Sequence, residues 1–574
     1  MSEGVTAIAG GDLLARTLQQ AGVAKVFALH GGHLEGFYKA CLELGIELVD
    51  FRHESSAGHA AEAYSRVTGK LGVCAVTSGP GFTNAVTAIA NANLDCVPTL
   101  FIVGAPPVRE AETNALQGGI DQTGMAASVT KWSHRILTTE RIPDLTAMAV
   151  RHATTGRRGA VLLEVPIDVL HMSVPADKAT RPAGIDVTPK PGASPGELDE
   201  AIRILRTAER PAIVCGVEAG FARCGPALTA FVERAGIPVF FNARGMGLLP
   251  SDHRLNGHLP GNLVSVDGPR PDTLLLLGTR LGMRLGGRGY SLIPADAEII
   301  QQFSDASEIG RIRDVTLPIA CDSGTFVQQL ADAAEGVEWP DHGEWCASLV
   351  GRQHEVAAQY PHCDMPGGVH PYHAAGAVIE AAGKDAILVI DGGEAASWAA
   401  SHGRTSEPGG IIAPGNLGCL GTGPGQSIGA QEAAPGRRVL QITGDGASGF
   451  HIGEFDVMRR RSLPVMTVIL NNEIWGMSLH GQQMMYGTNY SAIAALGGTQ
   501  YASIAKSFGC YGERVTRFAD IGPACQRAWD SGLPSCIEIM TDKDVTHPVT
   551  AAALGAPGEG EAVTLIPYYE NIPS

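Results

Sequence analysis

An acid and a pair of amides each follow an apolar stretch, and about one helix and one strand separate them. Asp445 stands in Gly-Asp-Gly after "VLQIT", and Asn471–Asn472 follow "PVMTVIL". Carboxylate, amide and carbonyl oxygens are hard ligands that Mg²⁺ binds together with phosphate oxygens. A helix that starts near Gly449 would point its N-terminus at an anion. The pattern therefore predicts a magnesium ion that holds a diphosphate.

A second candidate for chemistry is Glu54, which opens an alanine-rich helix in "DFRHESSAGHAAEAYSRVTGK". A glutamate in the first turn of a helix is stabilised by the helix dipole. Taken alone, Glu54 therefore fits an ordinary structural residue, and a catalytic role depends on what else the chain carries.

Three stretches of the chain alternate short apolar runs with helical patterns. The first contains "KVFAL", "GVCAVT" and "AVLLEVP", the second "PAIVCG", "TLLLLG" and "AEIIQQF", and the third "AILVIDGG", "VLQITGDG" and "SCIEIM". This alternation predicts an α/β fold of three tandem doubly wound parallel-sheet domains, with helices on both faces of each sheet. Two stretches rich in Pro and Gly, residues 174–200 and 362–371, are expected to be linkers. We expect domains at residues 1–185, 195–340 and 365–548, and a tail at 549–574 that could form a lid.

The composition limits the classes of partner. The 574 residues carry a formal net charge of −17, which argues against a nucleic-acid or anionic-membrane surface. The 12 cysteines are scattered and include no Cys-x-x-Cys pair, so a reduced chain fits better than a disulfide scaffold or a zinc site. Neither a signal pattern nor an apolar run of membrane-spanning length is found. We expect a cytoplasmic protein.

Gly-Asp-Gly followed by Asn-Asn resembles the motif of the thiamine-diphosphate-dependent enzymes, and "RHE…GHAAEAYSR" resembles their activating-glutamate segment. The resemblance implies that thiamine diphosphate and Mg²⁺ are the cofactors. By it, Asp445 and Asn472 bind the metal through their side chains and Ile474 through its carbonyl oxygen. Glu54 would then lie against N1′ of the aminopyrimidine and activate the cofactor.

The same resemblance assigns the three domains to pyrimidine binding, a central role and diphosphate binding. It places Gly79 in the turn beside the pyrimidine, the Gly418 carbonyl on the pyrimidine amino group, and Leu420 as the bulky residue that bends the cofactor. The glycines that flank Asp445 complete the cofactor-binding set: Gly444 and Gly446. In the family the two halves of the site come from different subunits, so a homodimer is required and a homotetramer is expected.

The similarity covers essentially the whole chain and is densest to the benzaldehyde-lyase branch, in "LHGGHLE", "GFTNAVTAIANANLD", "ETNALQGGIDQ" and "KWSHRI". This branch implies that His33 and Gln117 contact the reacting intermediate, and that the enzyme cleaves and forms 2-hydroxy ketones (acyloins) from aldehydes. Gln117 would position the hydroxyl oxygen while His33 or a water relays its proton. By the same resemblance the substrate pocket contains His30, Gly32, Ile167, Ala396, Pro414, Met477, His480 and Gly481.

Several pocket positions depart from that branch. Ile167, Ala396 and Pro414 stand where it has aromatic residues and a histidine, and Met477 and Gly481 stand where it has an alanine and a phenylalanine. The pocket is therefore reshaped, and Pro414 lacks a proton-relay group.

Other branches of the family remain open. The 2-hydroxyacyl-CoA lyases, which release formyl-CoA, have a glutamate shortly after the tryptophan, where "WGMSLHGQQMM" has no acid although His480 could substitute. Acetohydroxyacid synthases bind FAD in the central domain, for which "ARGMGLLPSDHRLNGHLPGN" gives no clear signal. A 2-keto acid decarboxylase is a further alternative. A non-catalytic scaffold is disfavoured because Glu54, Asp445 and Asn472 are all present.

Overall fold

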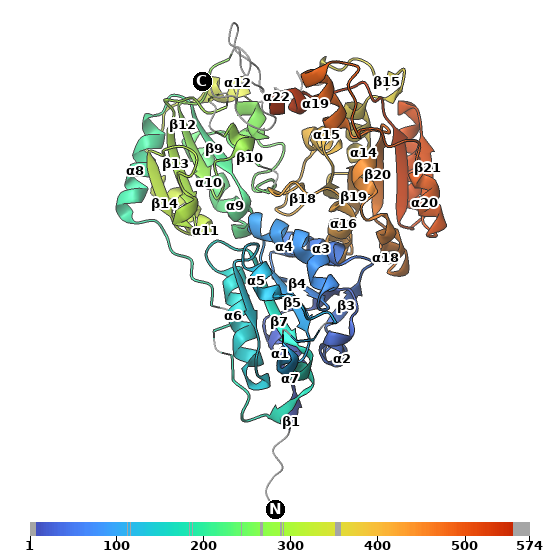
Figure 1. The fold of residues 1–574 in the computed structure, drawn as a ribbon. Coiled ribbons are helices and arrows are strands. Elements are labelled where there is room, and N and C mark those ends of the chain that lie inside the picture. The colour runs from blue at the N-terminus through green and yellow to red at the C-terminus, as the bar shows by residue number, and fades with distance from the viewer. Residues whose placement is uncertain are drawn as a thin grey trace, which may run out of the picture. The chain divides into compact units, whose positions relative to one another are not determined.

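The structure is a computed structural model (Figure 1). It describes residues 7–554 except 112, 115, 183, 186, 243, 264–267, 288–289, 291 and 350–357. Most of the expected C-terminal tail, residues 555–574, lies outside the described residues. The chain divides into two compact units. The first unit comprises Met1–Pro189, Pro414–Pro435 and His451–Leu463, and the second comprises Lys190–Ala413, Gly436–Phe450 and Pro464–Ser574.

The first unit is built on one parallel sheet of six strands in the order β3-β2-β4-β5-β7-β6. Its strands are β2 (Lys25–Ala28), β3 (Glu47–Asp50), β4 (Gly72–Val76), β5 (Thr99–Ala105), β6 (Trp132–Arg135) and β7 (Ala160–Pro166). The short strands β1 (Ala7–Ala9) and β8 (Ser173–Pro175) form an antiparallel pair apart from this sheet. β4, β5 and β7 are buried along their whole length, as expected for apolar strands covered on both faces.

The helices of the first unit pack in two groups. One group is α1 (Gly10–Gln20), α2 (Glu35–Glu43), α6 (Ile142–Thr154) and α7 (Ile167–His171). In the other, α3 (Glu54–Thr68) packs on α4 (Pro80–Leu94) and on α16 (Gly423–Ala433) (Figure 1). The unit also contains η1 (Gly32–Leu34), η2 (Val108–Glu110), α5 (Gln122–Ala126), η3 (Thr139–Arg141), η7 (Ile452–Glu454) and α18 (Phe455–Arg460).

The second unit contains two further six-stranded parallel sheets. The central sheet has the order β11-β10-β9-β12-β13-β14. Its elements are α8 (Pro195–Thr207), β9 (Pro211–Cys215), α9 (Val217–Ala222), α10 (Gly225–Ala235), β10 (Val239–Phe241), β11 (Asn256–His258), η4 (Pro260–Leu263), β12 (Thr273–Leu277), η5 (Met283–Leu285), β13 (Glu298–Phe303), η6 (Ala306–Glu308), β14 (Leu317–Ala320), α11 (Ser323–Ala333) and α12 (Gly343–Leu349).

The C-terminal sheet has the order β18-β17-β19-β20-β22-β21. Its strands are β17 (Ile387–Ile390), β18 (Ile411–Ile412), β19 (Val439–Gly444), β20 (Met466–Asn471), β21 (Tyr511–Val515) and β22 (Ser535–Met540). Its helices are α14 (Pro371–Ala382), α15 (Glu394–His402), α17 (Asp445–Ser448), α19 (Gly476–Tyr486), α20 (Tyr501–Ser507), η8 (Phe518–Asp520), α21 (Ile521–Asp530) and α22 (Pro548–Leu554). The three parallel sheets confirm the predicted α/β fold.

Three local expectations were wrong. Pro195–Glu200, expected in a linker, begins α8, because Ser194 and Glu197 form a capping box and Pro195 suits the first helical position. Residues 362–371 contain the antiparallel strands β15 (Asp364–Met365) and β16 (Gly368–Val369). The helix expected to start near Gly449 starts at Ile452, as η7 followed by α18, and a separate single turn, α17, starts at Asp445 itself.

Candidate functional site

The first half of the site lies where the parallel strands of the first unit end. Glu54 begins α3 shortly after β3, and its side chain is buried although no cation contacts it among the described residues. Asn84 on α4 donates a hydrogen bond from Nδ2 to Glu54 Oε2 at 2.9 Å. The preceding residue, His53, caps the helix by accepting from the Ser55 amide at 3.1 Å. The turn of α3 that carries Glu54 is thus fixed by neutral donors and acceptors.

His33 and Gln117 both lie beside the residues that follow β4. His33 Nδ1 is 3.0 Å from the Thr77 hydroxyl oxygen, and burial lowers the pKa of His33. Ser78 donates its hydroxyl to the Gln117 carbonyl, and a Cβ on Gly79 would lie only 3.1 Å from Gln117 Cα. Gln117 and Gly79 both have positive φ, near 58° and 66°. The structure therefore brings the two expected substrate-contacting residues to the same end of the sheet as Gly79.

Gln122, which the sequence analysis did not single out, supports this turn. It accepts from the Gly79 amide at 2.8 Å through Oε1 and donates from Nε2 to Glu164 at 2.8 Å. Glu164 is itself paired with Arg135. No sequence signal marks Gln122, because its partners Gly79, Gly104 and Glu164 lie in one turn and two separate strands.

The pocket residues expected in this unit have different environments. His30 is exposed and pairs with Glu35, with Nε2 at 2.7 Å from Oε1. Gly32 begins η1, and Ile167 is the half-buried first residue of α7. Pro414 begins the segment that leads to Gly418, which has a φ of 75°, and to Leu420. Their roles stay predictions.

The second half of the site lies in the second unit, where β19 and β20 end. Asp445 is 3 % exposed, and its Oδ2 has no hydrogen-bond partner among the described residues. Burial raises the pKa of Asp445 to about 7, although the backbone amides of Gly446 and Glu473 oppose this rise. Tyr501 donates its hydroxyl to the Asp445 carbonyl at 2.8 Å. The arrangement leaves one buried carboxylate oxygen for a ligand that the protein itself does not supply.

The two adjacent asparagines have different tasks. Asn471, at the end of β20, donates to Glu538 at 2.8 Å and accepts from the Glu473 amide at 3.1 Å, so it holds the turn together. Asn472 is less buried, and its Oδ1 accepts only weakly from the Ile474 amide, at 3.3 Å. Of the pair, Asn472 therefore has the oxygen that a metal could take.

Several glycines and one tryptophan lie beside this turn. A Cβ on Gly446 would lie 2.5 Å from the Trp475 ring, so this position requires glycine. Gly392, at the end of β17, has a φ of 103°, and a Cβ there would lie 3.3 Å from the Gly444 amide nitrogen. Backbone can thus approach a ligand closely at Gly444 and Gly446.

Family models match all three parts of the chain. The N-terminal, central and C-terminal domains of thiamine pyrophosphate enzymes match residues 8–125, 198–330 and 391–539. The chain belongs to the thiamine pyrophosphate enzymes.

Curated relatives cover nearly the full length of this thiamine pyrophosphate enzyme. A probable acetolactate synthase of Mycobacterium bovis is 33% identical over 543 residues, which is 94% of this chain and 96% of that protein. The large subunit of an acetolactate synthase from Mycobacterium tuberculosis shows the same identity and coverage. The large subunit of acetolactate synthase isozyme 2 from Escherichia coli is 28% identical over 93% of this chain and 96% of its own length.

The residues of this enzyme fit a magnesium diphosphate. The orphaned Asp445 Oδ2, the Asn472 amide oxygen and the Ile474 carbonyl are oxygen donors, as Mg²⁺ requires. A cation beside Asp445 would also favour its ionised form, which burial otherwise opposes. Among the described residues, no three His, Cys, Asp or Glu side chains form a metal-binding group, so the site depends on these amide and carbonyl oxygens.

A buried pair near the second half of the site was missed. Glu394, the first residue of α15, accepts from His480 Nδ1 on α19 at 2.9 Å, and His480 Nε2 lies 2.8 Å from the Lys543 carbonyl. Burial alone would lower the pKa of His480, but the Glu394 carboxylate raises it overall. Thr550 also donates to Glu394. Glu394 and His480 are separated by 86 positions in the sequence, so the pair has no local signal.

The other expected pocket residues of this unit lie on the same two helices. Ala396 is buried in α15, and Met477 in α19 lies beside Gly393, where a Cβ would be 3.5 Å from Met477 Cβ. A side chain added at Gly481 would meet open space. The pocket and its expected reshaping stay predictions. No described helix is long and apolar enough to cross a membrane.

Proposed function

We propose that this enzyme is a thiamine-diphosphate-dependent carboligase that joins two carbonyl substrates, in the manner of an acetolactate synthase. The similarity to acetolactate synthases over 94% of the chain carries the proposal. In this reaction the donor is a 2-keto acid that loses CO₂, and the acceptor is the carbonyl carbon of a second 2-keto acid.

The proposed roles follow from the two halves of the site. When bound, thiamine diphosphate supplies a carbon nucleophile that adds to the donor carbonyl. Glu54 holds a proton at N1′ of the aminopyrimidine, and Asn84 keeps this carboxyl group in place. Asp445 and Asn472 hold Mg²⁺ and through it the diphosphate. His33, whose pKa burial lowers, accepts or returns a proton at the substrate oxygen.

We also propose that two copies of the chain combine to complete each site. In one copy, Glu54 bonds to Asn84 near the start of α4, whereas the segment with Gly418 and Leu420 bonds to Asn91 and Asp95 near its end. At 1.5 Å rise per residue, these two places on α4 are about 10–16 Å apart. Glu54 and the segment with Gly418 are thus held at different ends of α4 in one copy, which supports a site that a second copy completes.

A second candidate reaction is reversible acyloin cleavage and aldehyde ligation. The observation that favours this reaction is that His33 and Gln117 both lie beside the turn that contains Gly79. Gln117 can position the hydroxyl oxygen of an acyloin, and the same contact would serve cleavage and ligation. Pro414 and Ala396 offer no proton to a carbanion-like centre, which favours its capture by a second aldehyde.

A substrate panel separates these reactions. The purified protein is supplied with thiamine diphosphate and Mg²⁺ and offered pyruvate, benzoin, an aliphatic acyloin and a 2-hydroxyacyl-CoA. We expect pyruvate to give CO₂ and acetolactate in a 1:1 ratio. Aldehydes released from acyloins, without CO₂ from pyruvate, would replace the first proposal with the second. Formyl-CoA release alone would replace both with a 2-hydroxyacyl-CoA lyase.

A further inference from the structure

The segment that leads from Pro414 to Thr422 has no helix or strand, yet it is expected to carry two cofactor contacts, Gly418 and Leu420. Gly418 and Gly421 have φ angles of 75° and 76°. Leu417 and Gly418 are exposed. A segment without secondary structure needs hydrogen bonds to other parts of the protein, which we call its anchors, to hold one conformation.

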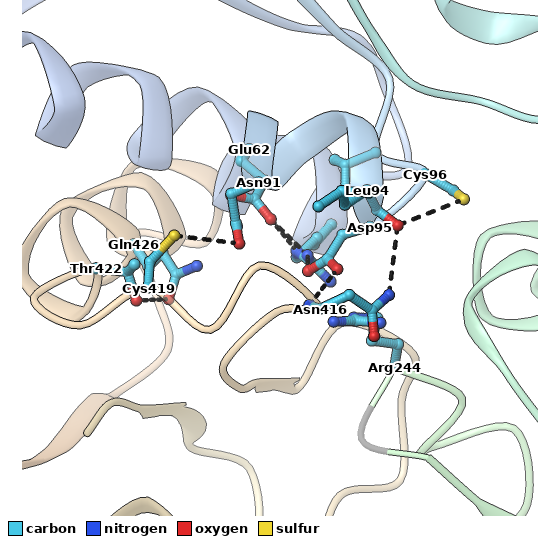
Figure 2. Close-up of polar contacts among 12 residues, drawn as sticks. Glu62, Asn91, Leu94, Asp95, Cys96, Arg244, Asn416, Cys419, Thr422 and Gln426 are labelled. Atoms are coloured by element: carbon cyan, nitrogen blue, oxygen red, sulfur yellow. Dashed lines mark hydrogen bonds and ion pairs between the residues drawn. The ribbon is translucent and has the colours of Figure 1, made fainter. Parts of the chain in front are cut away.

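Its anchors come from the C-terminal part of α4. The Asn416 amide donates to Asp95 Oδ1 at 2.9 Å, and the Asn416 side chain donates to the Leu94 carbonyl at 3.3 Å. Cys419 donates its thiol to Asn91 Oδ1 at 3.7 Å. Figure 2 shows Asn416 and Cys419 turned toward this part of α4.

Gly415 packs tightly against Asn91 and Asp95. A Cβ at this position would lie 2.4 Å from Asn91 Oδ1 and 2.4 Å from Asp95 Oδ2. The backbone therefore rests directly on the side chains of Asn91 in α4 and of Asp95, the residue that follows α4, and even an alanine would push it away.

Behind these anchors lies a buried ionic network. Arg66 on α3 donates to Asp95 Oδ2 at 2.8 Å and also pairs with Glu62. Asn91 donates to Glu62 Oε2 at 2.8 Å. Glu62 and Asp95 are 0% exposed. Burial would raise the pKa of Glu62, but the Arg66 charge holds it below its ordinary value.

Each anchor faces both the network and the segment. Asp95 uses one oxygen for Arg66 and the other for the Asn416 amide. Asn91 donates to Glu62 and accepts from Cys419. We infer that Asp95 is a positioning residue: fixed by Arg66, it holds the Pro414–Thr422 segment in the shape that receives the pyrimidine of thiamine diphosphate. The inference rests on the proposed function for the part that Gly418 and Leu420 play.

The test is the variant Asp95→Asn. A carboxylate accepts through both oxygens, whereas an amide accepts through one, so either Arg66 or the Asn416 amide must lose its acceptor. Glu432→Gln is the matched control. Glu432 is a buried carboxylate of α16 that bonds to both Lys25 and Arg461, at 2.5 and 2.6 Å, without touching the segment.

Two measurements are made on cofactor-free protein. Hydrogen exchange of a peptide covering residues 411–422 reports the shape of the segment, and calorimetry with Mg²⁺ reports the Kd of thiamine diphosphate. For Asp95→Asn we expect faster exchange at Asn416 and a Kd about 10- to 100-fold higher, the effect of losing one charged hydrogen bond. For Glu432→Gln we expect a similar fall in melting temperature, with exchange and Kd as in the wild type.

Equal Kd values for the two variants would overturn the inference. If Asp95→Asn fails to fold, Gly415→Ala decides, because it displaces the segment without removing a charge. An unchanged Kd in Gly415→Ala would also overturn the inference. A wild-type protein that binds the cofactor but joins no carbonyl substrates would refute the proposed reaction alone, since exchange and Kd still test Asp95.

Discussion

Replacing Asp445 with Asn should stabilise the cofactor-free protein at alkaline pH while it removes cofactor binding. The folded protein raises the pKa of Asp445 from 3.8 to about 7 through burial. A carboxyl group with a raised pKa costs stability wherever it is forced to ionise, so the wild type loses stability as the pH rises from about 4 to about 7. At 1.36 kcal/mol per pH unit, the full cost above pH 7 is about 4 kcal/mol.

The asparagine removes this cost but adds a smaller one. Its Oδ1 can keep the backbone donors of Asp445, and its Nδ2 takes the place of Oδ2, which has no partner among the described residues. A buried donor without an acceptor costs about 1–3 kcal/mol. The expected net gain at pH 8 is therefore about 1–3 kcal/mol, and near pH 4 the variant should be the less stable protein.

Thermal unfolding of EDTA-treated protein at pH 4.5 and pH 8 measures the effect. Glu538→Gln is the control, because both oxygens of this buried carboxylate already accept hydrogen bonds, from Asn471 and the Ala502 amide. That variant should be destabilised at both pH values. Adding Mg²⁺ with thiamine diphosphate should stabilise the wild type by about 2.7 kcal/mol at 100 times the Kd and leave Asp445→Asn unchanged. A difference between Asp445→Asn and wild type that does not change with pH would refute the reasoning.

Three further changes test other parts of the site. Glu54→Gln should lower turnover by at least about 100-fold, because a glutamine cannot exchange the N1′ proton. Calorimetry should show that this variant still binds the cofactor. Exchange of the thiazolium C2 proton at the wild-type rate would contradict the role of Glu54. Gln117→Ala should weaken acyloin cleavage and ligation by a similar factor, about 10-fold for one lost hydrogen bond to a reacting oxygen, and a change in only one direction would count against a shared contact. Gly446→Ala should lower stability by about 1–3 kcal/mol by overpacking against Trp475, as measured by the melting temperature; a melting temperature equal to wild type would show that Trp475 can move.

The predictable parts of the fold were those with a local signal. The buried strands of the three sheets are continuous apolar runs, such as "AVLLEVP" at β7 and "VLQITG" at β19. The start of α8 also had a local signal, Ser194 with Glu197, but the surrounding Pro and Gly residues suggested a linker instead. The β15–β16 pair could not be foreseen, because strands of two residues have no periodicity to read.

The residues of the candidate site also divide into those with a local sequence signal and those without one. Asp445 and the Asn471–Asn472 pair follow apolar strands, so their type and spacing were sufficient to select them, whereas the choice of Asn472 as the metal ligand came from the family resemblance. Glu394 and His480 meet only because α15 and α19 begin close together after β17 and β20, and the distance between them in the sequence hides the pair. Asp95 was part of a quoted segment, yet only the contact with Asn416 shows what it holds.

The partners of the buried carboxylates separate structural acids from the acids proposed to act. Glu62 and Glu432 are each paired with arginine or lysine, so their charge is neutralised within the protein and they serve to fix helices. Glu54 instead receives a neutral amide, and one Asp445 oxygen has no partner among the described residues. For Asp445, a cation bound at this oxygen would supply a counter-charge and would favour the ionised carboxylate, which burial opposes. Glu454 meets the same criterion: burial raises its pKa to about 7, and Oε2 accepts from the Arg52 amide, two residues before Glu54. The first unit therefore has two buried carboxyl groups, Glu54 and Glu454, around the first turn of α3, and neither forms a side-chain ion pair among the described residues.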